Sequence, residues 1–221
     1  LLWVASAAAP FMEHADDTPA GVSRLHAFEL ATGELHARFE TPAPSLLNDV
    51  AVLPDGRAVV TDSAADAVWI TAEGGRLEPF VSAGAVSGPN GIAASADGAV
   101  VYVASWTGIV VIDVATRRTE ALTLPPQTTN LAGIDGLYVD DGALIGIQNA
   151  VGRPRVVRVS LDGGAVEVLE SGSAVVDNPT TGVIVGDELV FLARRNRESA
   201  FTDGATPVLE DIVIARVPLL R

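Results

Sequence analysis

The sequence predicts an all-β fold, a β-propeller made of four-stranded antiparallel blades. Short runs rich in Val, Ile and Leu recur every eight to twelve residues between turn residues, and no stretch has a convincing 3.6-residue apolar period. One motif, a short apolar strand that follows a small polar residue and stops at an Asp-Gly turn, repeats at intervals in the forties. Repeats of this length with four strands per unit are typical of propellers.

The repeated motif defines three strand heads. Its copies read LLNDVAVLPDG, PNGIAASADG and GIDGLYVDDG, with Asn48, Asn90 and Asp135 at their heads, 42 and 45 residues apart. A weaker fourth copy, NPTTGVIVGD, follows Asp177 and looks structural by comparison. Asp-Gly pairs supply the positive φ angles of tight hairpins. We therefore expect the Asp-Gly end of each copy to be a structural hairpin turn and the residue at its head to be the functional one.

The four strands of a blade align from repeat to repeat. In the best-formed repeat we expect strands at 91–95, 100–104, 108–113 and 118–122. The first segment of the chain lacks an innermost strand and the last lacks an outermost one, so the prediction is three full and two partial blades. We expect a single propeller domain over residues 1–221, an incomplete six-bladed ring that lacks roughly its first blade, with residues upstream of Leu1 missing.

Composition excludes several classes of function. The net charge of −14 disfavours nucleic acid and anionic membrane surfaces as partners. The absence of Cys excludes thiol chemistry, and the absence of Lys excludes a Schiff base. The apolar first ten residues are too short to cross a bilayer. A cation and a small-molecule substrate fit this chain best, and neither its compartment nor its oligomeric state follows from the composition.

The three heads favour a metal site. The first strand of a blade is its innermost strand, so its leading side chain is expected to point into the central channel. Asn48, Asn90 and Asp135 offer two carboxamides and one carboxylate, oxygen ligands that suit Ca²⁺ rather than Zn²⁺. The alternative is that each is a turn residue bonded to its own backbone. Three such residues at one repeat position favour the site.

The strings LLNDVAVLPDG, PNGIAASADG and GIDGLYVDDGALIGIQN resemble the senescence-marker-protein/gluconolactonase family of six-bladed propellers, which is related to the paraoxonases and strictosidine synthase-like proteins. The resemblance implies a divalent cation, usually Ca²⁺, held by a first-blade Glu, two Asn and an Asp. Asn48, Asn90 and Asp135 match the last three, and the Glu has no counterpart here. It also implies that Asp135 is both ligand and general base, and that Asn48 is a ligand or a substrate contact.

Four further residues are candidates for the substrate pocket. His14 lies in a long acidic loop on the face of the heads, and Trp106 is either a substrate wall or a plug. Gln148 and Asn149 end a strand on that face, where they line the pocket or pair with neighbouring backbone. No Gly-x-Ser-x-Gly elbow occurs, so a Ser-His-Asp hydrolase has no support.

Together these features predict a metal-dependent hydrolase of a lactone or related ester. The alternative is a non-catalytic propeller that binds a small ligand or a protein partner through the same face, because one fold hosts many functions. Binding of Ca²⁺ or another divalent cation separates the two.

Overall fold

A computed structural model describes residues 1–8, 21–41, 44–126, 130–194 and 211–219. The chain forms two compact units, Leu1–Ala121 and Leu122–Arg221, and each is described by itself. The described residues contain eighteen β-strands and no helix, and therefore no helix long and apolar enough to cross a membrane. The prediction of one propeller domain stays a prediction.

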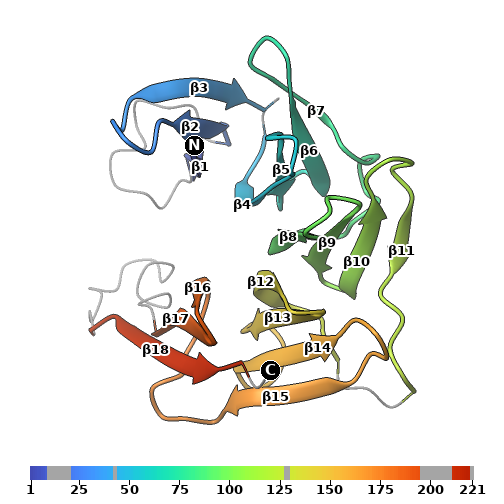
Figure 1. The fold of residues 1–221 in the computed structure, drawn as a ribbon, viewed down its shortest axis with the longest axis vertical. Helices are drawn as coiled ribbons and strands as arrows, with labels where there is room; N and C mark the ends of the chain where they lie inside the picture. The colour runs from blue at the N-terminus through green and yellow to red at the C-terminus, as the bar shows by residue number, and fades with distance from the viewer. Residues whose placement is uncertain (9–20, 42–43, 127–129, 195–210, 220–221) are drawn as a thin grey trace. The chain divides into compact units, whose positions relative to one another are not determined.

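The first unit contains two sheets (Figure 1). The strands of the first sheet are β1 (Leu2–Ala7), β2 (Ser23–Phe28), β3 (Leu35–Glu40), β4 (Leu47–Val52), β5 (Ala58–Asp62), β6 (Ala67–Ala72) and β7 (Arg76–Pro79). Those of the second are β8 (Ile92–Ala94), β9 (Val100–Ser105), β10 (Gly108–Asp113) and β11 (Thr119–Ala121).

The first of these sheets is two blades in hydrogen-bond contact. Its order is β1-β2-β3-β7-β6-β5-β4, and β3 meets β7 through a parallel pair between Glu40 and Arg76. All other neighbours in it are antiparallel. It is therefore a three-stranded blade, β1–β3, beside a four-stranded blade, β4–β7.

Apolar side chains between consecutive blades form the core of this unit. Val59 and Val68 from the β4–β7 blade cluster with Val101, Val103 and Ile112 from the β8–β11 blade. All five are fully buried. Burying each aliphatic side chain stabilises the fold by about 1.5–3 kcal/mol, so face-to-face packing of the sheets is what holds the blades in series.

The second unit repeats the arrangement. Its strands are β12 (Ile134–Asp140), β13 (Ala143–Gln148), β14 (Arg155–Ser160), β15 (Val166–Ser171), β16 (Gly182–Val185), β17 (Glu188–Arg194) and β18 (Val213–Pro218). The first four form one antiparallel sheet and the last three another (Figure 1). Ile145 and Ile147 of the first pack with Leu189 and Phe191 of the second.

The predicted blade pattern is confirmed. The described strands make three four-stranded and two three-stranded blades, in the order expected. In the β8–β11 blade the predicted bounds differ from the observed ones by at most one residue. The Asp-Gly turns behave as expected: Gly56 and Gly142 have φ of +87° and +70°, a region that glycine enters without steric cost.

Candidate functional site

Two of the three predicted heads sit on β-bulges. In β4 the register slips between Leu47 and Val50, and in β12 it slips between Ile134 and Gly136. Leu47 pairs with Asp62 and Ile134 with Gln148, the last residues of β5 and β13, so Asn48 and Asp135 are equivalent. A bulge adds one residue to a strand and re-aims its side chain, and bulges are frequent beside functional sites.

The other heads follow from backbone hydrogen bonds. Asn90 donates its N–H to Ala104 O at 3.0 Å, just before β8. Thr180 donates its N–H to Leu192 O at 3.1 Å, just before β16, in the same pattern. The fourth copy, which follows Asp177 in the sequence, therefore has Thr180 at its head, and Asp177 forms an isolated parallel bridge with Arg194. We call Asn48, Asn90, Asp135 and Thr180 the head position.

In the β4–β7 blade a loop side chain holds the head. Asn48 Nδ2 donates to Ser63 Oγ at 2.9 Å, and Ser63 Oγ donates to Pro89 O at 2.6 Å. Pro89 directly precedes Asn90, the head of the next blade. Ser63 therefore ties one head to the backbone that carries the following one.

The β12–β15 blade repeats this arrangement with different residues. Asn149 Nδ2 donates to Asp135 Oδ2 at 2.6 Å and to Pro179 O at 2.7 Å. Pro179 directly precedes the head Thr180. Ser63 and Asn149 both follow the last residue of their blade's second strand, so they share one position in the repeat. We call it the clasp position.

The β8–β11 blade breaks the pattern. Its clasp position is Trp106, which follows the last residue of β9 and has 59% of its surface exposed. Asn90 Oδ1 in that blade is buried and has no hydrogen-bond partner among the described residues. An unpaired buried acceptor costs about 1–3 kcal/mol. The chain thus leaves one head oxygen unsatisfied at the blade whose clasp residue is an exposed indole.

The side chain of Gln148 is fully buried. Its Nε2 donates to Asn130 O at 3.0 Å and to Ala132 O, while its Oε1 accepts from Arg155 Nε at 2.6 Å. These contacts correspond to the alternative in which Gln148 pairs with neighbouring backbone. Its amide holds the loop before β12 against β13 and so supports Asp135 and Asn149.

Asp62 occupies the position of Gln148 in the β4–β7 blade and has the same supporting role. Its fully buried carboxylate accepts from the N–H groups of Leu46, Ala64 and Ala65 and from Trp69 Nε1. These donors satisfy the charge and fix the segment that leads into Asn48.

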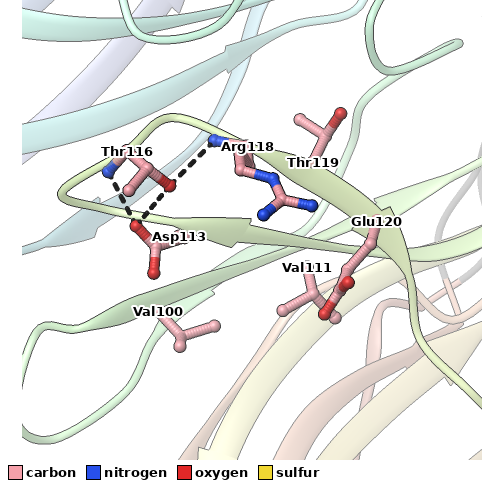
Figure 2. A pocket seen from close by; sticks show the side chains of 7 residues that line it. All are labelled: Val100, Val111, Asp113, Thr116, Arg118, Thr119 and Glu120. Carbon is pink, nitrogen blue, oxygen red and sulfur yellow. Dashed lines mark hydrogen bonds between the residues drawn. The ribbon is translucent and has the colours of Figure 1, made fainter.

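The remaining pocket candidate, His14, lies outside the described residues. A cavity of about 280 Å³ does open elsewhere in the first unit, on β9, β10 and β11 (Figure 2). It is lined by Val100, Val111, Asp113, Thr116, Arg118, Thr119 and Glu120. No head or clasp residue lines it, so it is separate from the candidate site.

Asp113, one of the two carboxylates in this cavity, is a turn cap. The backbone N–H and the hydroxyl of Thr116 both donate to Asp113 Oδ1 at 2.7 Å (Figure 2). These bonds, the backbone bond first, lower the pKa of Asp113 below its usual range. A carboxylate so engaged closes the β10–β11 turn and is not poised to take up a proton.

The heads fit a hard cation better than a transition metal. The described residues contain no group of three or more His, Cys, Asp and Glu side chains able to hold a metal ion. The heads instead supply amide and carboxylate oxygens, donors that Ca²⁺ accepts. Among the head oxygens of the first unit, Asn90 Oδ1 is the one that is buried and has no hydrogen-bond donor among the described residues.

Sequence reasoning missed Ser63 and the connection between consecutive blades. Ser63 is a lone serine after Thr-Asp, a pattern without chemical signal of its own. Aligning the residue after each second strand would have revealed it, because the three entries in that column are Ser63, Trp106 and Asn149.

Comparisons with known proteins support the fold. No protein-family profile matches the chain, and no curated protein matches it. Solved structures do match. TolB from Acinetobacter baumannii superposes with a TM-score of 0.61 at 19% identity, over 92% of this chain and 48% of its own.

Two further structural neighbours carry informative names. Regucalcin from Agrobacterium tumefaciens, a calcium-binding protein, has a TM-score of 0.60 at 18% identity, over 90% of this chain and 74% of its own. A gluconolactonase from Xanthomonas campestris has a TM-score of 0.56 at 18% identity, over 76% of this chain and 62% of its own. The chain thus spans about half to three quarters of these proteins. At such identities the likeness shows the β-propeller fold alone, which confirms the predicted fold class.

Proposed function

We propose that the chain is part of a Ca²⁺-dependent hydrolase of a lactone or related ester, with oxygen ligands from Asn48, Asn90 and Asp135. The ligand set comes from the sequence repeat and the family resemblance. Neighbours that include a calcium-binding regucalcin and a gluconolactonase support the class of function. The observation that carries the proposal is the buried, unpartnered Oδ1 of Asn90.

A purely structural Asn at this position would be expected to pair both ends of its amide. More than nine in ten buried polar groups have a partner, and exceptions are frequent at functional sites. Asn48 and Asp135 each bond to a clasp residue, whereas Asn90 Oδ1 has none among the described residues. A cation or a ligand donor at Asn90 would remove this cost on binding.

The residues have distinct roles in the proposed reaction. A bound divalent cation would polarise the scissile carbonyl and lower the pKa of water. Asp135 would accept the proton of the attacking water as general base. Asn149, which donates to Asp135 Oδ2 at 2.6 Å, would hold that carboxylate in orientation. Asn90 would contribute its amide oxygen to the cation.

The alternative function is a propeller that binds a ligand at the same face without turnover. The exposed Trp106 and the unpaired Oδ1 of Asn90, in the same blade, favour this alternative equally. Turnover separates the two: a Ca²⁺-dependent thermal shift without hydrolysis across a panel of lactones and esters would favour the binding protein.

The test is a Ca²⁺ titration followed by thermal unfolding. At about a hundred times its Kd, a ligand stabilises by about 2.7 kcal/mol, which for a domain of this size raises Tm by about 5–11 °C. We expect this shift in the wild type and its loss in Asn90→Ala and Asp135→Ala. Absence of any shift in the wild type would refute the metal site.

The metal-free proteins supply the control. Asn90→Ala removes an unsatisfied buried acceptor, so it should leave the metal-free free energy of unfolding unchanged or slightly higher. Gln148→Ala removes an amide whose donors and acceptors are all engaged, and should lower it by about 2 kcal/mol or more. Equal losses in both variants would mean that Asn90 is an ordinary structural residue.

A further inference from the structure

The exposed indole of Trp106 lies directly on Gly88. A Cβ built at Gly88 would be 2.1 Å from Trp106 Cδ1 and 2.2 Å from its Nε1, distances that no real side chain tolerates. Gly88 also has a φ of +53°, in the left-handed region. The glycine therefore allows the five-membered ring of the indole to approach the backbone, while 59% of the residue's surface stays exposed.

Backbone hydrogen bonds fix both sides of this contact. Trp106 donates its N–H to Ser87 O at 3.0 Å. Gly88 donates its N–H to Asp66 Oδ1 at 2.7 Å. The loop before β8 and the turn after β9 are thereby joined, so the backbone on both sides of the indole contact is held. A rigid contact surface binds at a lower entropic cost than a mobile one.

Asn90, whose Oδ1 has no partner among the described residues, lies at the same end of the β8–β11 sheet as Trp106. Asn90 lies two residues after Gly88 and donates its N–H to Ala104 O, two residues before Trp106. In the other two blades the clasp residue is small or polar and engages the head. Here the clasp residue is aromatic, and Asn90 Oδ1 is left without a partner. A buried, unpaired acceptor and an exposed indole therefore lie at the same end of this blade.

We infer that Trp106 is a stacking platform for an uncharged aromatic ring of the substrate, so that the protein prefers aryl lactones or esters to aliphatic ones. The preference for aryl substrates in hydrolysis rests on the proposed function, whereas binding of an aromatic ring to Trp106 does not. An aromatic pair is worth about 1 kcal/mol beyond the area that it buries, about a fivefold change in affinity. The net charge of −14 disfavours an anionic ring.

The first experiment measures binding without catalysis. Chroman has the ring system of a benzo-fused six-membered lactone but no carbonyl group, so it cannot be hydrolysed. It is titrated into the protein while Trp emission is recorded. Tetrahydropyran, which lacks the aromatic ring, is the control ligand. We expect a saturable blue shift with chroman and at least fivefold weaker binding of tetrahydropyran. Equal affinities, or no saturable shift, would overturn the inference.

Three variants test the geometry. Trp106→Ala removes the ring, and Gly88→Ala keeps it but displaces it. Both should weaken chroman binding about fivefold or more, measured by titration calorimetry because Trp106→Ala also removes the indole whose emission reports binding. Gly84→Ala is the matched control, because Gly84 has a φ of +76° but open space at its Cβ, so it carries the backbone strain without the collision. Weakening by Gly84→Ala equal to that by Gly88→Ala would overturn the inference.

Hydrolysis separates this inference from the proposed function. If chroman binds through Trp106 but neither the benzo-fused lactone nor its monocyclic counterpart is hydrolysed, the platform stands and the hydrolase fails. If both lactones are hydrolysed with the same kcat/KM, and Trp106→Ala leaves both values unchanged, the hydrolase stands and the platform fails.

Discussion

Asp49 accepts a hydrogen bond from the backbone N–H of Ile92 at 3.0 Å, across 43 residues and two blades. Tyr138 does the same for Gly182: its hydroxyl oxygen accepts from the Gly182 N–H at 2.6 Å, across 44 residues. Ile92 and Gly182 each begin the innermost strand of the following blade. The same backbone donor is therefore satisfied by the preceding blade in both units, once by a carboxylate and once by a phenol.

Gly136 explains why a phenol replaces the carboxylate as acceptor in the second unit. It is the equivalent of Asp49, and a Cβ there would be 2.8 Å from both Tyr138 Oη and Thr180 O. The phenol can reach Gly182 because the preceding position carries no side chain. The Asp49–Ile92 and Tyr138–Gly182 hydrogen bonds are therefore alternative ways to join neighbouring blades at the strand next to the head.

Asp49→Ala should destabilise the first unit by about 2 kcal/mol, because a half-buried N–H loses a charged acceptor. Urea unfolding measures this loss. Asp55→Ala is the control: Asp55 pairs with Arg57 on an exposed hairpin, where an ion pair is worth about 0–1 kcal/mol. Similar losses in both variants would contradict a role of Asp49 between blades.

Gly136→Ala should lower the free energy of unfolding by about 1–3 kcal/mol, because the new methyl group collides with Tyr138 Oη. Tyr138→Phe should cost about 1 kcal/mol, the value of the lost hydrogen bond. Gly163→Ala is the matched control, since it has open space and no positive φ. A loss from Gly163→Ala as large as that from Gly136→Ala would show that the collision is not the cause.

Asn149 and Asp135 should be energetically coupled without any metal. Asn149→Ala, Asp135→Ala and the double variant form a cycle, and contacting residues typically couple by about 0.5–3 kcal/mol. We expect a coupling energy of about 1–2 kcal/mol from chemical unfolding in a chelator. Additive losses would mean that Asn149 does not hold the carboxylate. In Ca²⁺, Asn149→Ala should also weaken cation binding about tenfold.

Two turn carboxylates should report acid unfolding. Ser95 lowers the pKa of Asp97, chiefly through its side-chain hydrogen bond, and Thr116 lowers the pKa of Asp113, chiefly through its backbone N–H. A lowered folded-state pKa contributes stability above the unfolded value of about 4, and this is lost as the pH falls through the folded value. The stability contributed by these two carboxylates should therefore be constant above about pH 5 and be lost below about pH 4.

Substitution separates the two turns. Ser95→Ala should raise the pKa of Asp97 towards its ordinary value, because the largest cause is removed. Thr116→Val keeps the backbone N–H, so Asp113 should retain part of its lowered pKa. Carbon-detected NMR titration measures both. An unchanged pKa of Asp97 in Ser95→Ala would contradict the role of the hydroxyl.

Local sequence determined the strands and their turns. Short runs of Val, Ile and Leu that end at Asp-Gly specify hairpins, because such residues favour strands and glycine enters positive φ without steric cost. Four strands repeated about every 45 residues then define blades. The predicted heads Asn48, Asn90 and Asp135 are equivalent in the structure for the same reason: each lies within two residues of the start of an innermost strand.

Tertiary structure alone decided which atoms meet. Ser63 hydrogen-bonds to Pro89, and Asn149 to Asp135 and Pro179. These partners are 14–30 residues apart in the sequence, so no local pattern encodes the contacts. Thr180 is the head of the fourth copy because register, and not the preceding acidic residue Asp177, sets the start of a strand. That Asn90 Oδ1 is buried without a partner, beside an indole fixed on Gly88, depends on packing between blades, because burial and hydrogen-bond satisfaction are properties of the assembled fold.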